Sequence, residues 1–177
     1  MKVGAEFIFH SSLLAIDALG FSFLPSPISE GSQRILIRQI LTDYARPLNR
    51  SNLDPHYSLP PQGLWSSCFA TPDQAAQATA RSLRDGSSIG AKDLLKRLRW
   101  ITLGYHYNWD TKLYSKESYT PFPEDLAQVV SELVGVCIPS AVVPEAAIVN
   151  FYRPGDTLTA HSDYSEPNNA APLVSIR

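Results

Sequence analysis

The stretch from Ala146 to Asp163 places the strongest constraint on the fold of this 177-residue chain. It begins with an apolar run, Ala146-Ala147-Ile148-Val149, which is typical of a buried strand. Pro154-Gly155-Asp156 then predicts a turn. From Thr157 to Asp163 apolar and polar residues alternate, which predicts a second strand. The stretch therefore indicates a strand, a turn and a strand that ends in His161-Ser162-Asp163.

The spacing of His161 and Asp163 would let both side chains bind one metal ion. Residues i and i+2 of a strand point to the same face of a sheet, so the imidazole and the carboxylate can approach the same ion. Two His and one carboxylate, with coordination positions left open, form the facial triad of non-haem Fe(II) oxygenases. The pair alone is a weak signal, because a chain with four His contains His-x-Asp by chance in roughly one case in five. Its position at the end of the strand-turn-strand pattern strengthens the metal interpretation.

Length and composition predict a globular domain rather than a disordered tail. The hydrophobic content is 44%, which is enough for a proper core, and the length suits one domain. A net charge of -2 at pH 7 gives no overall basic field, so nucleic-acid contacts would have to come from local patches. A solvated helix face explains the nearest basic cluster better than a phosphate patch does. This cluster contains Lys92, Lys96, Arg97 and Arg99.

The N-terminal part of the chain carries no clear targeting signal. Polar residues interrupt the apolar stretch from Phe7 to Leu24, and no clean cleavage pattern follows, so we expect no membrane-spanning segment and no membrane partner. We divide the chain into an N-terminal segment without a defined pattern, residues 1–20, and a domain, residues 21–177. Cys68 and Cys137 lack Cys-x-x-Cys spacing, which favours a reduced, intracellular protein. Cytoplasm or nucleus is the expected compartment, with the mitochondrion as an alternative.

Hydrophobic periodicity predicts several further elements. Ser29 is a suitable N-cap for a first helix that Pro47 ends. Residues 47–90 read as a long irregular connection with a short helix over Pro72 to Arg84. Three more elements are expected, a short helix over Lys92 to Arg99, a strand over Ile101 to Tyr107, and a helix that follows Pro121-Phe122-Pro123 and ends at Pro139. The buried face of the last helix is expected to comprise Leu126, Val129, Val130, Leu133, Val134 and Val136.

An aromatic segment precedes the last of these helices. Leu98 to Asp110 reads Leu-Arg-Trp-Ile-Thr-Leu-Gly-Tyr-His-Tyr-Asn-Trp-Asp, and Tyr119-Thr120-Pro121-Phe122-Pro123 follows it. Together with Asn150 to Glu166, these segments resemble the AlkB family of Fe(II)- and 2-oxoglutarate-dependent dioxygenases. The likeness runs from about Leu94 to Ser175 and is weaker over Phe21 to Tyr44.

The resemblance implies a fold, an activity and two cofactors. The fold would be α+β, with N-terminal helices packed on an incomplete double-stranded β-helix, or jelly roll. The activity would be oxidative demethylation of methylated bases in nucleic acid, either tRNA or DNA, by a protein that we expect to be a monomer. The cofactors would be Fe(II) and, as cosubstrate, 2-oxoglutarate. Aromatic side chains suit such a substrate, because a base can stack on them.

The resemblance also assigns roles to particular residues. The iron ligands would be His161 and Asp163. The cosubstrate site would comprise Asn150, Phe151 and Tyr152, with Phe151 in place of a common tyrosine. Substrate contacts would come from Trp65, Tyr105, His106, Tyr107 and Asn108. Without the resemblance, Tyr105 and Tyr107 read equally well as core residues, and His106 reads better as a surface or hydrogen-bonded residue than as a ligand.

The sequence departs from the family pattern after Ser175. No His follows Asp163, and the family's second iron histidine, its pair of arginines and its later strands have no counterpart here. We therefore expect a C-terminally truncated domain that is catalytically poor on its own, because chelation and charge neutralisation would both be weakened. A non-catalytic nucleic-acid-binding or regulatory fragment of the same family is the main alternative. A metal-free, lectin-like β-sandwich is a third interpretation.

Overall fold

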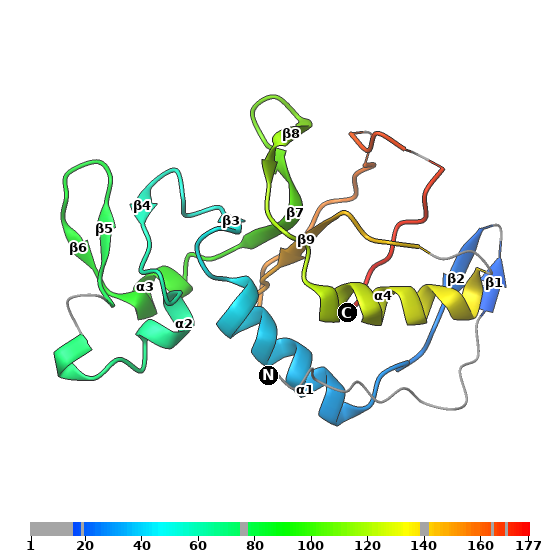
Figure 1. Ribbon diagram of the computed structural model, residues 1–177, viewed down its shortest axis with the longest axis horizontal. Coiled ribbons are helices and arrows are strands. Elements are labelled where there is room, and N and C mark those ends of the chain that lie inside the picture. Colours follow the sequence, from blue (N-terminus) through cyan, green and yellow to red (C-terminus); the bar gives the residue numbers. More distant parts are fainter. Residues whose placement is uncertain (1–15, 19, 75–77, 139–141, 164, 169) are drawn as a thin grey trace.

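The structure is a computed structural model, and it describes residues 16–18, 20–74, 78–138, 142–163, 165–168 and 170–177 (Figure 1). The helical elements are α1 (Glu30–Gln39), the π-helical segment η1 (Ile40–Tyr44), α2 (Leu64–Ser67), the 3-10 turn η2 (Pro72–Gln74), α3 (Ala91–Leu95) and α4 (Glu124–Cys137). The strands are β1 (Ile16–Ala18), β2 (Phe21–Phe23), β3 (Arg50–Ser51), β4 (Tyr57–Ser58), β5 (Ala80–Ser82), β6 (Ser88–Ile89), β7 (Trp100–Asn108), β8 (Leu113–Tyr119) and β9 (Ala146–Asn150). No helix within these ranges has the length and apolarity needed to cross a membrane.

Strand β7 is the centre of the fold. Its first half pairs with two strands, β9 along residues 100–104 and β3 along residues 101–102, and its second half pairs with β8. All three pairings are antiparallel. A strand with neighbours on both edges is buried, and Ile101, Thr102 and Leu103 are each no more than 2% exposed. The expected strand over Ile101 to Tyr107 is therefore confirmed, with one more residue at each end.

Gly104 bends β7 at its midpoint. Its φ of +71° is accessible to glycine but unfavourable for other residues, and a Cβ atom there would lie 1.9 Å from the carbonyl oxygen of Glu145. Beyond the bend, the backbone N–H of Tyr105 donates to that same carbonyl oxygen at 3.0 Å. The rings of Trp100, at the start of β7, and of Trp109, just beyond its end, lie 5.0 Å apart.

Helices α1 and α4 cover the sheet and share its core (Figure 1). The hydroxyl of Ser29 accepts a hydrogen bond from the backbone N–H of Ser32, which confirms Ser29 as the N-cap of α1. At the start of α4, the carboxylate of Asp125 accepts hydrogen bonds from the hydroxyl of Tyr44 at 2.7 Å and from the side chain of Gln39. The two helices are thus joined by a part-buried polar contact as well as by apolar packing.

The structure differs from the sequence prediction in the bounds of two helices and in the burial of one helical residue. Helix α3 ends at Leu95 instead of continuing to Arg99. Among the described residues of the helix expected over Pro72 to Arg84, the first three form the turn η2 and Ala80–Ser82 form strand β5, while residues 75–77 lie outside the described structure. Val136 is 42% exposed, so it is not part of the buried face of α4, whose other expected members are buried. Periodicity missed these details because short helices depend on tertiary contacts more than on their own pattern.

The strand expected over Thr157 to Asp163 is not formed. These residues have no ladder partner among the described residues and are exposed throughout. The alternation in the sequence indicated a strand, but a strand exists only where a neighbour exchanges hydrogen bonds with it. The α+β class holds, since β3, β7, β8 and β9 form one sheet under helices, whereas the incomplete β-helix remains a prediction.

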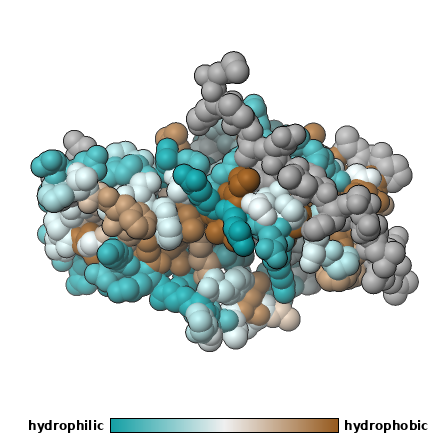
Figure 2. Space-filling view, turned by 90° about the horizontal axis from the view of Figure 1, so that it is seen from below, coloured by the Kyte–Doolittle hydropathy of each residue, from teal (hydrophilic) through white to brown (hydrophobic). Residues whose placement is uncertain are grey.

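Apolar side chains also remain at the surface. The face in Figure 2 has hydrophobic residues, in brown, interspersed among hydrophilic ones, in teal. The most exposed of the large hydrophobic side chains described is Leu48, at 84%. A single exposed leucine is ordinary, but its backbone conformation, described below, is not.

Candidate metal and substrate site

His161 and Asp163 approach each other although they are not in a strand. The Nε2 atom of His161 lies 3.6 Å from Oδ1 of Asp163, and each side chain is about half exposed. The Nδ1 atom of His161 lies 2.8 Å from the backbone carbonyl oxygen of Thr159. A carbonyl oxygen can only accept, so Nδ1 is the donor in this contact and Nε2 is the ring nitrogen that faces Asp163.

This arrangement fits a shared metal ion. Metal-binding histidines commonly donate their second ring N–H to a backbone carbonyl, as His161 does to Thr159. With bonds of about 2.1 Å, two ligands of one ion lie roughly 3.0 Å apart at right angles and roughly 3.6 Å apart at 120°. The observed 3.6 Å is within this range. Within the described residues, however, no three His, Cys, Asp or Glu side chains gather closely enough to hold an ion together.

The segment that follows this pair is anchored on the β7–β8 hairpin. The hydroxyl of Tyr107, from β7, lies 3.3 Å from Oγ of Ser165, and the hydroxyl of Tyr114, from β8, donates to Glu166 at 2.8 Å. Burial and the neighbouring carboxylate of Glu166 raise the pKa of Tyr114, so its hydroxyl stays a neutral donor. The hairpin therefore lies beside His161 and Asp163, the candidate metal pair.

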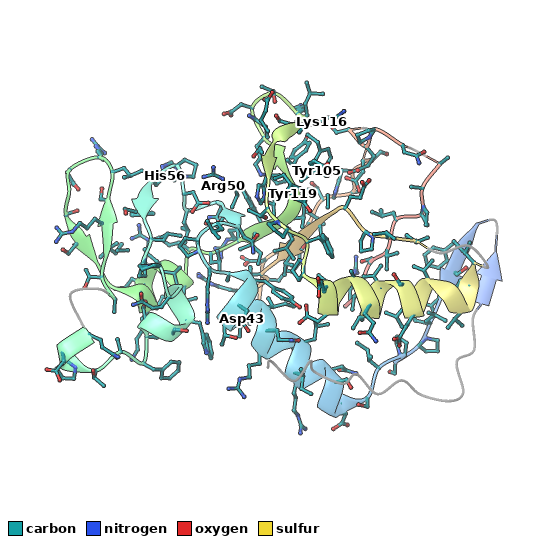
Figure 3. All side chains as sticks on the ribbon, in the orientation of Figure 1. Asp43, Arg50, His56, Tyr105, Lys116 and Tyr119 are labelled. Carbon is teal, nitrogen blue, oxygen red and sulfur yellow. The ribbon has the colours of Figure 1, made fainter. Side chains whose placement is uncertain are left out.

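Aromatic rings cover the same hairpin. Tyr107 contacts the rings of Tyr114 at 5.3 Å and Trp109 at 4.9 Å, and Tyr105 contacts Tyr119 at 4.8 Å. Tyr105 and Tyr119 lie side by side in Figure 3. Both contacts across the hairpin join residues that are also partners in the β7–β8 register. Trp109 and Tyr119 are about half exposed and the other three rings are partly buried, so this group offers stacking surfaces for a planar ligand.

Two of the expected substrate contacts are used by the fold itself. His106 is only 4% exposed, and its ring nitrogens lie 2.8 Å from the hydroxyl of Thr102 and 3.2 Å from that of Thr120. Burial lowers the pKa of His106, which keeps the ring neutral. The amide oxygen of Asn108 accepts hydrogen bonds from the N–H groups of Asp110 and Thr111, so it closes the hairpin turn. The structure thus favours the hydrogen-bonded interpretation of His106 over a substrate contact.

The expected cosubstrate residues lie at the end of β9. Asn150 and Tyr152 are exposed, whereas the ring of Phe151 between them packs against the core. Within the described residues, no hydrogen bond or ion pair joins Asn150 or Tyr152 to His161 or Asp163. The turn after this segment forms as expected, because Asp156 accepts from the backbone N–H of Arg153.

Trp65 is not close to the other expected site residues. It lies on α2, which contacts α3 and η1, and Figure 1 places α2 well away from the β8 hairpin and from the C-terminal segment, in red. Its ring contacts that of Phe69 at 5.6 Å, and it is 37% exposed. The structure therefore places Tyr107 beside the segment that follows His161 and Asp163 but leaves Trp65 apart.

Two anchoring residues were not found from the sequence. Tyr114 could have been found, because a turn of Asp and Lys residues follows the β7 aromatics and predicts a hairpin whose second strand begins at Leu113. Glu166 had no such signal, since nothing in a single sequence indicates which tyrosine a carboxylate contacts.

Comparison with known proteins decides the family. Residues 57–177 match the family model described as the 2OG-Fe(II) oxygenase superfamily. The chain belongs to this superfamily. The AlkB-like resemblance in the sequence is thereby confirmed, because the proteins that this chain is similar to include ones named as a nucleic acid dioxygenase and a tRNA demethylase.

Three similar proteins define the likeness more closely. The nucleic acid dioxygenase ALKBH1 of Mus musculus is 41% identical over 158 residues, and that of Homo sapiens is 40% identical over 160 residues. The tRNA demethylase abh1 of Schizosaccharomyces pombe is 36% identical over 165 residues. The matches cover 89 to 90% of this oxygenase chain but only 38% of the two mammalian proteins and 54% of the yeast one.

Proposed function

We propose that this oxygenase domain takes part in Fe(II)- and 2-oxoglutarate-dependent oxidative demethylation of methylated bases in nucleic acid, in tRNA or DNA. The observation that supports this most is the convergence of His161 and Asp163 beside the aromatic β7–β8 hairpin. A metal-binding pair next to partly exposed rings would provide for both an oxidising centre and a planar substrate.

Each group in the proposed site has a physical task. His161 would bind the metal through Nε2, since Thr159 holds its Nδ1 proton, and Asp163 would supply the negative charge. Bound Fe(II) with 2-oxoglutarate supplies the oxidising chemistry. Tyr105 and Tyr107 would support the face of the base, while Asn150 and Tyr152 would donate to the cosubstrate. Phe151 would position these two by packing on the core.

We expect the 177 residues alone to bind metal weakly. Two ligands leave most of the coordination sphere to water, and no third His, Cys, Asp or Glu joins the pair within the described structure. We accordingly expect this polypeptide by itself to be catalytically poor. A non-catalytic nucleic-acid-binding role for the isolated chain is the second candidate, and the same observation favours it.

Anaerobic titration with Fe(II), followed by calorimetry, tests the metal pair. His161→Ala and Asp163→Ala should each abolish the binding that the unaltered chain has. His56→Ala is a matched control, because His56 is also exposed and lies in the separate β4–β5 region. Equal binding by all variants would refute the pair as ligands. Tight binding with succinate release from a methylated oligonucleotide would instead refute the expected weakness of the isolated chain.

A further inference from the structure

A hollow of about 360 Å³ lies on the edge of the sheet where β3 begins. It is lined by Pro47, Leu48, Asn49, Arg50, Asp54, Tyr119 and Thr120. None of these residues belongs to the metal pair or to the expected cosubstrate and substrate set. The hollow combines one guanidinium group, one half-exposed aromatic ring and several polar side chains, and this is the chemistry that a nucleotide phosphate and its base require.

Arg50 is the cation that lines the hollow. Its side chain is exposed and makes no hydrogen bond or ion pair with the described residues, although its charge acts on Asp54 and His106. Asp54 forms no ion pair with Arg50 within the described residues, and its carboxylate instead accepts from the backbone N–H of Ser51 at 2.6 Å and from the Ser51 hydroxyl at 3.3 Å. The backbone of Arg50 is fixed by its pairing with Thr102 of β7. The guanidinium can therefore bind an anion while the backbone that carries it is held in place.

The loop before Arg50 is held in a strained conformation. Leu48 has a φ of +101°, which is unfavourable for a leucine, and its side chain points to solvent with 84% exposure. Asn49 holds the loop in place, since its amide donates to the carbonyl of Tyr44 and its amide oxygen accepts from the hydroxyl of Thr120. The exposed side chain of Leu48 does not stabilise the core. Its unfavourable backbone angle instead shapes the loop that lines the hollow.

The hollow is continuous with the aromatic surface of the hairpin. Tyr119, on its wall, is 49% exposed and contacts Tyr105, and Figure 3 shows Arg50 close to this pair of rings. Tyr107 is two residues further along β7, beyond an irregularity in the β7–β8 register, and its hydroxyl contacts Ser165, two residues after Asp163. A row of rings thus leads from the hollow towards His161 and Asp163.

We propose that the hollow binds a backbone phosphate of single-stranded nucleic acid through Arg50, with the adjoining base stacked on Tyr119. The strand would continue along the hairpin towards the metal pair. This subsite rests on the proposed function, because it presumes a nucleic-acid substrate. It would hold a nucleotide that flanks the modified one and would contribute affinity without distinguishing one base from another.

Fluorescence anisotropy with a labelled, unmodified oligothymidylate tests this over a series of NaCl concentrations. Each phosphate contact on a single strand contributes about -0.7 to the slope of log Kobs against log[salt]. Arg50→Gln should reduce the steepness by about 0.7 and weaken binding several-fold at low salt. Tyr119→Leu should weaken binding at least about 5-fold with little change of slope. Arg84→Gln is the matched control, since Arg84 is an exposed arginine that lines a different hollow.

The outcomes separate this subsite from the proposed function. If the oligothymidylate binds and Arg50→Gln leaves the slope unchanged, or if Arg84→Gln has the same effect, the phosphate subsite is refuted while the demethylase proposal stands. If the unaltered chain binds no oligonucleotide at all, both fail. Thymidine monophosphate serves as a competitor. If it displaces the labelled oligothymidylate when both are at the same concentration, the proposal that the site binds a continuous strand is refuted. Thermal unfolding of each variant confirms that the fold is retained.

Discussion

Replacing Gly104 by Ala should destabilise this domain far more than any other glycine-to-alanine change in its described structure. The new Cβ atom would lie 1.9 Å from the carbonyl oxygen of Glu145, whereas real Cβ contacts hardly ever fall below 3.0 Å. The backbone at residue 104 and that at Glu145 would therefore have to move apart by at least 1.1 Å, the difference between these two distances. That movement would break the 3.0 Å hydrogen bond from the N–H of Tyr105 to the same oxygen.

The magnitude follows from the conformational cost, the lost hydrogen bond and the disturbed packing. A positive φ costs an alanine about 1 to 2 kcal/mol, the lost hydrogen bond costs about 1 kcal/mol, and the displaced core packing of β7 adds to both. We expect the free energy of unfolding to fall by about 3 to 5 kcal/mol in total, which lowers Tm by roughly 10 °C for a chain of this length. Urea unfolding followed by circular dichroism measures the change.

Two other glycines provide matched controls. Gly86 has nearly the same backbone angle, with φ of +70°, but no described atom lies within 4 Å of the place that a Cβ would take, so Gly86→Ala should cost only about 1 kcal/mol. Gly135 lies in helix α4 with open space around it, and Gly135→Ala should stabilise the domain by about 0.5 to 1 kcal/mol. If Gly104→Ala costs no more than Gly86→Ala, the close approach to Glu145 does not exist in solution.

Three further changes test other parts of the fold. Ser29→Ala should lower the free energy of unfolding by about 1 kcal/mol through loss of the helix cap, measurable as a Tm shift. Asp125→Ala should cost about 2 to 3 kcal/mol in urea unfolding, because it leaves the hydroxyl of Tyr44 buried without its acceptor, and Asp125→Asn should cost less. Burial lowers the pKa of His106, so the unfolded chain binds its proton more readily. Stability should therefore fall as the pH drops below about 6.5, and less so in His106→Gln.

The sequence predicted those parts of the fold in which local pattern and tertiary contact agree. Ser29 caps α1 because a serine before an amphipathic run needs no distant partner to do so. The β7 strand and helix α4 are long enough for periodicity to be clear. The bend at Gly104 could not be predicted, because a glycine in a strand pattern indicates a bulge or a close approach without naming the other chain segment.

The candidate site was predicted only as far as residue types allow. The pairing of His161 with Asp163 survives the absence of the expected strand, because the carbonyl of Thr159 orients the imidazole instead. The resemblance assigned His106 to the substrate, whereas alternation along β7 turns it to the face opposite Tyr105 and Tyr107, where two threonines bind it. Arg50 went unnoticed, since its importance comes from a hollow that separated segments of the chain build.

The attachment of residues 165 and 166 to the hairpin has a thermodynamic consequence. Tyr107 and Tyr114 restrain the segment that begins two residues after Asp163, so any molecule that settles on these rings also limits the positions open to the carboxylate and the imidazole. Binding of a ligand on the rings would then alter the metal affinity of His161 and Asp163. Linkage requires metal binding to change the affinity of the rings for that ligand by the same factor. The two binding events would therefore be thermodynamically coupled.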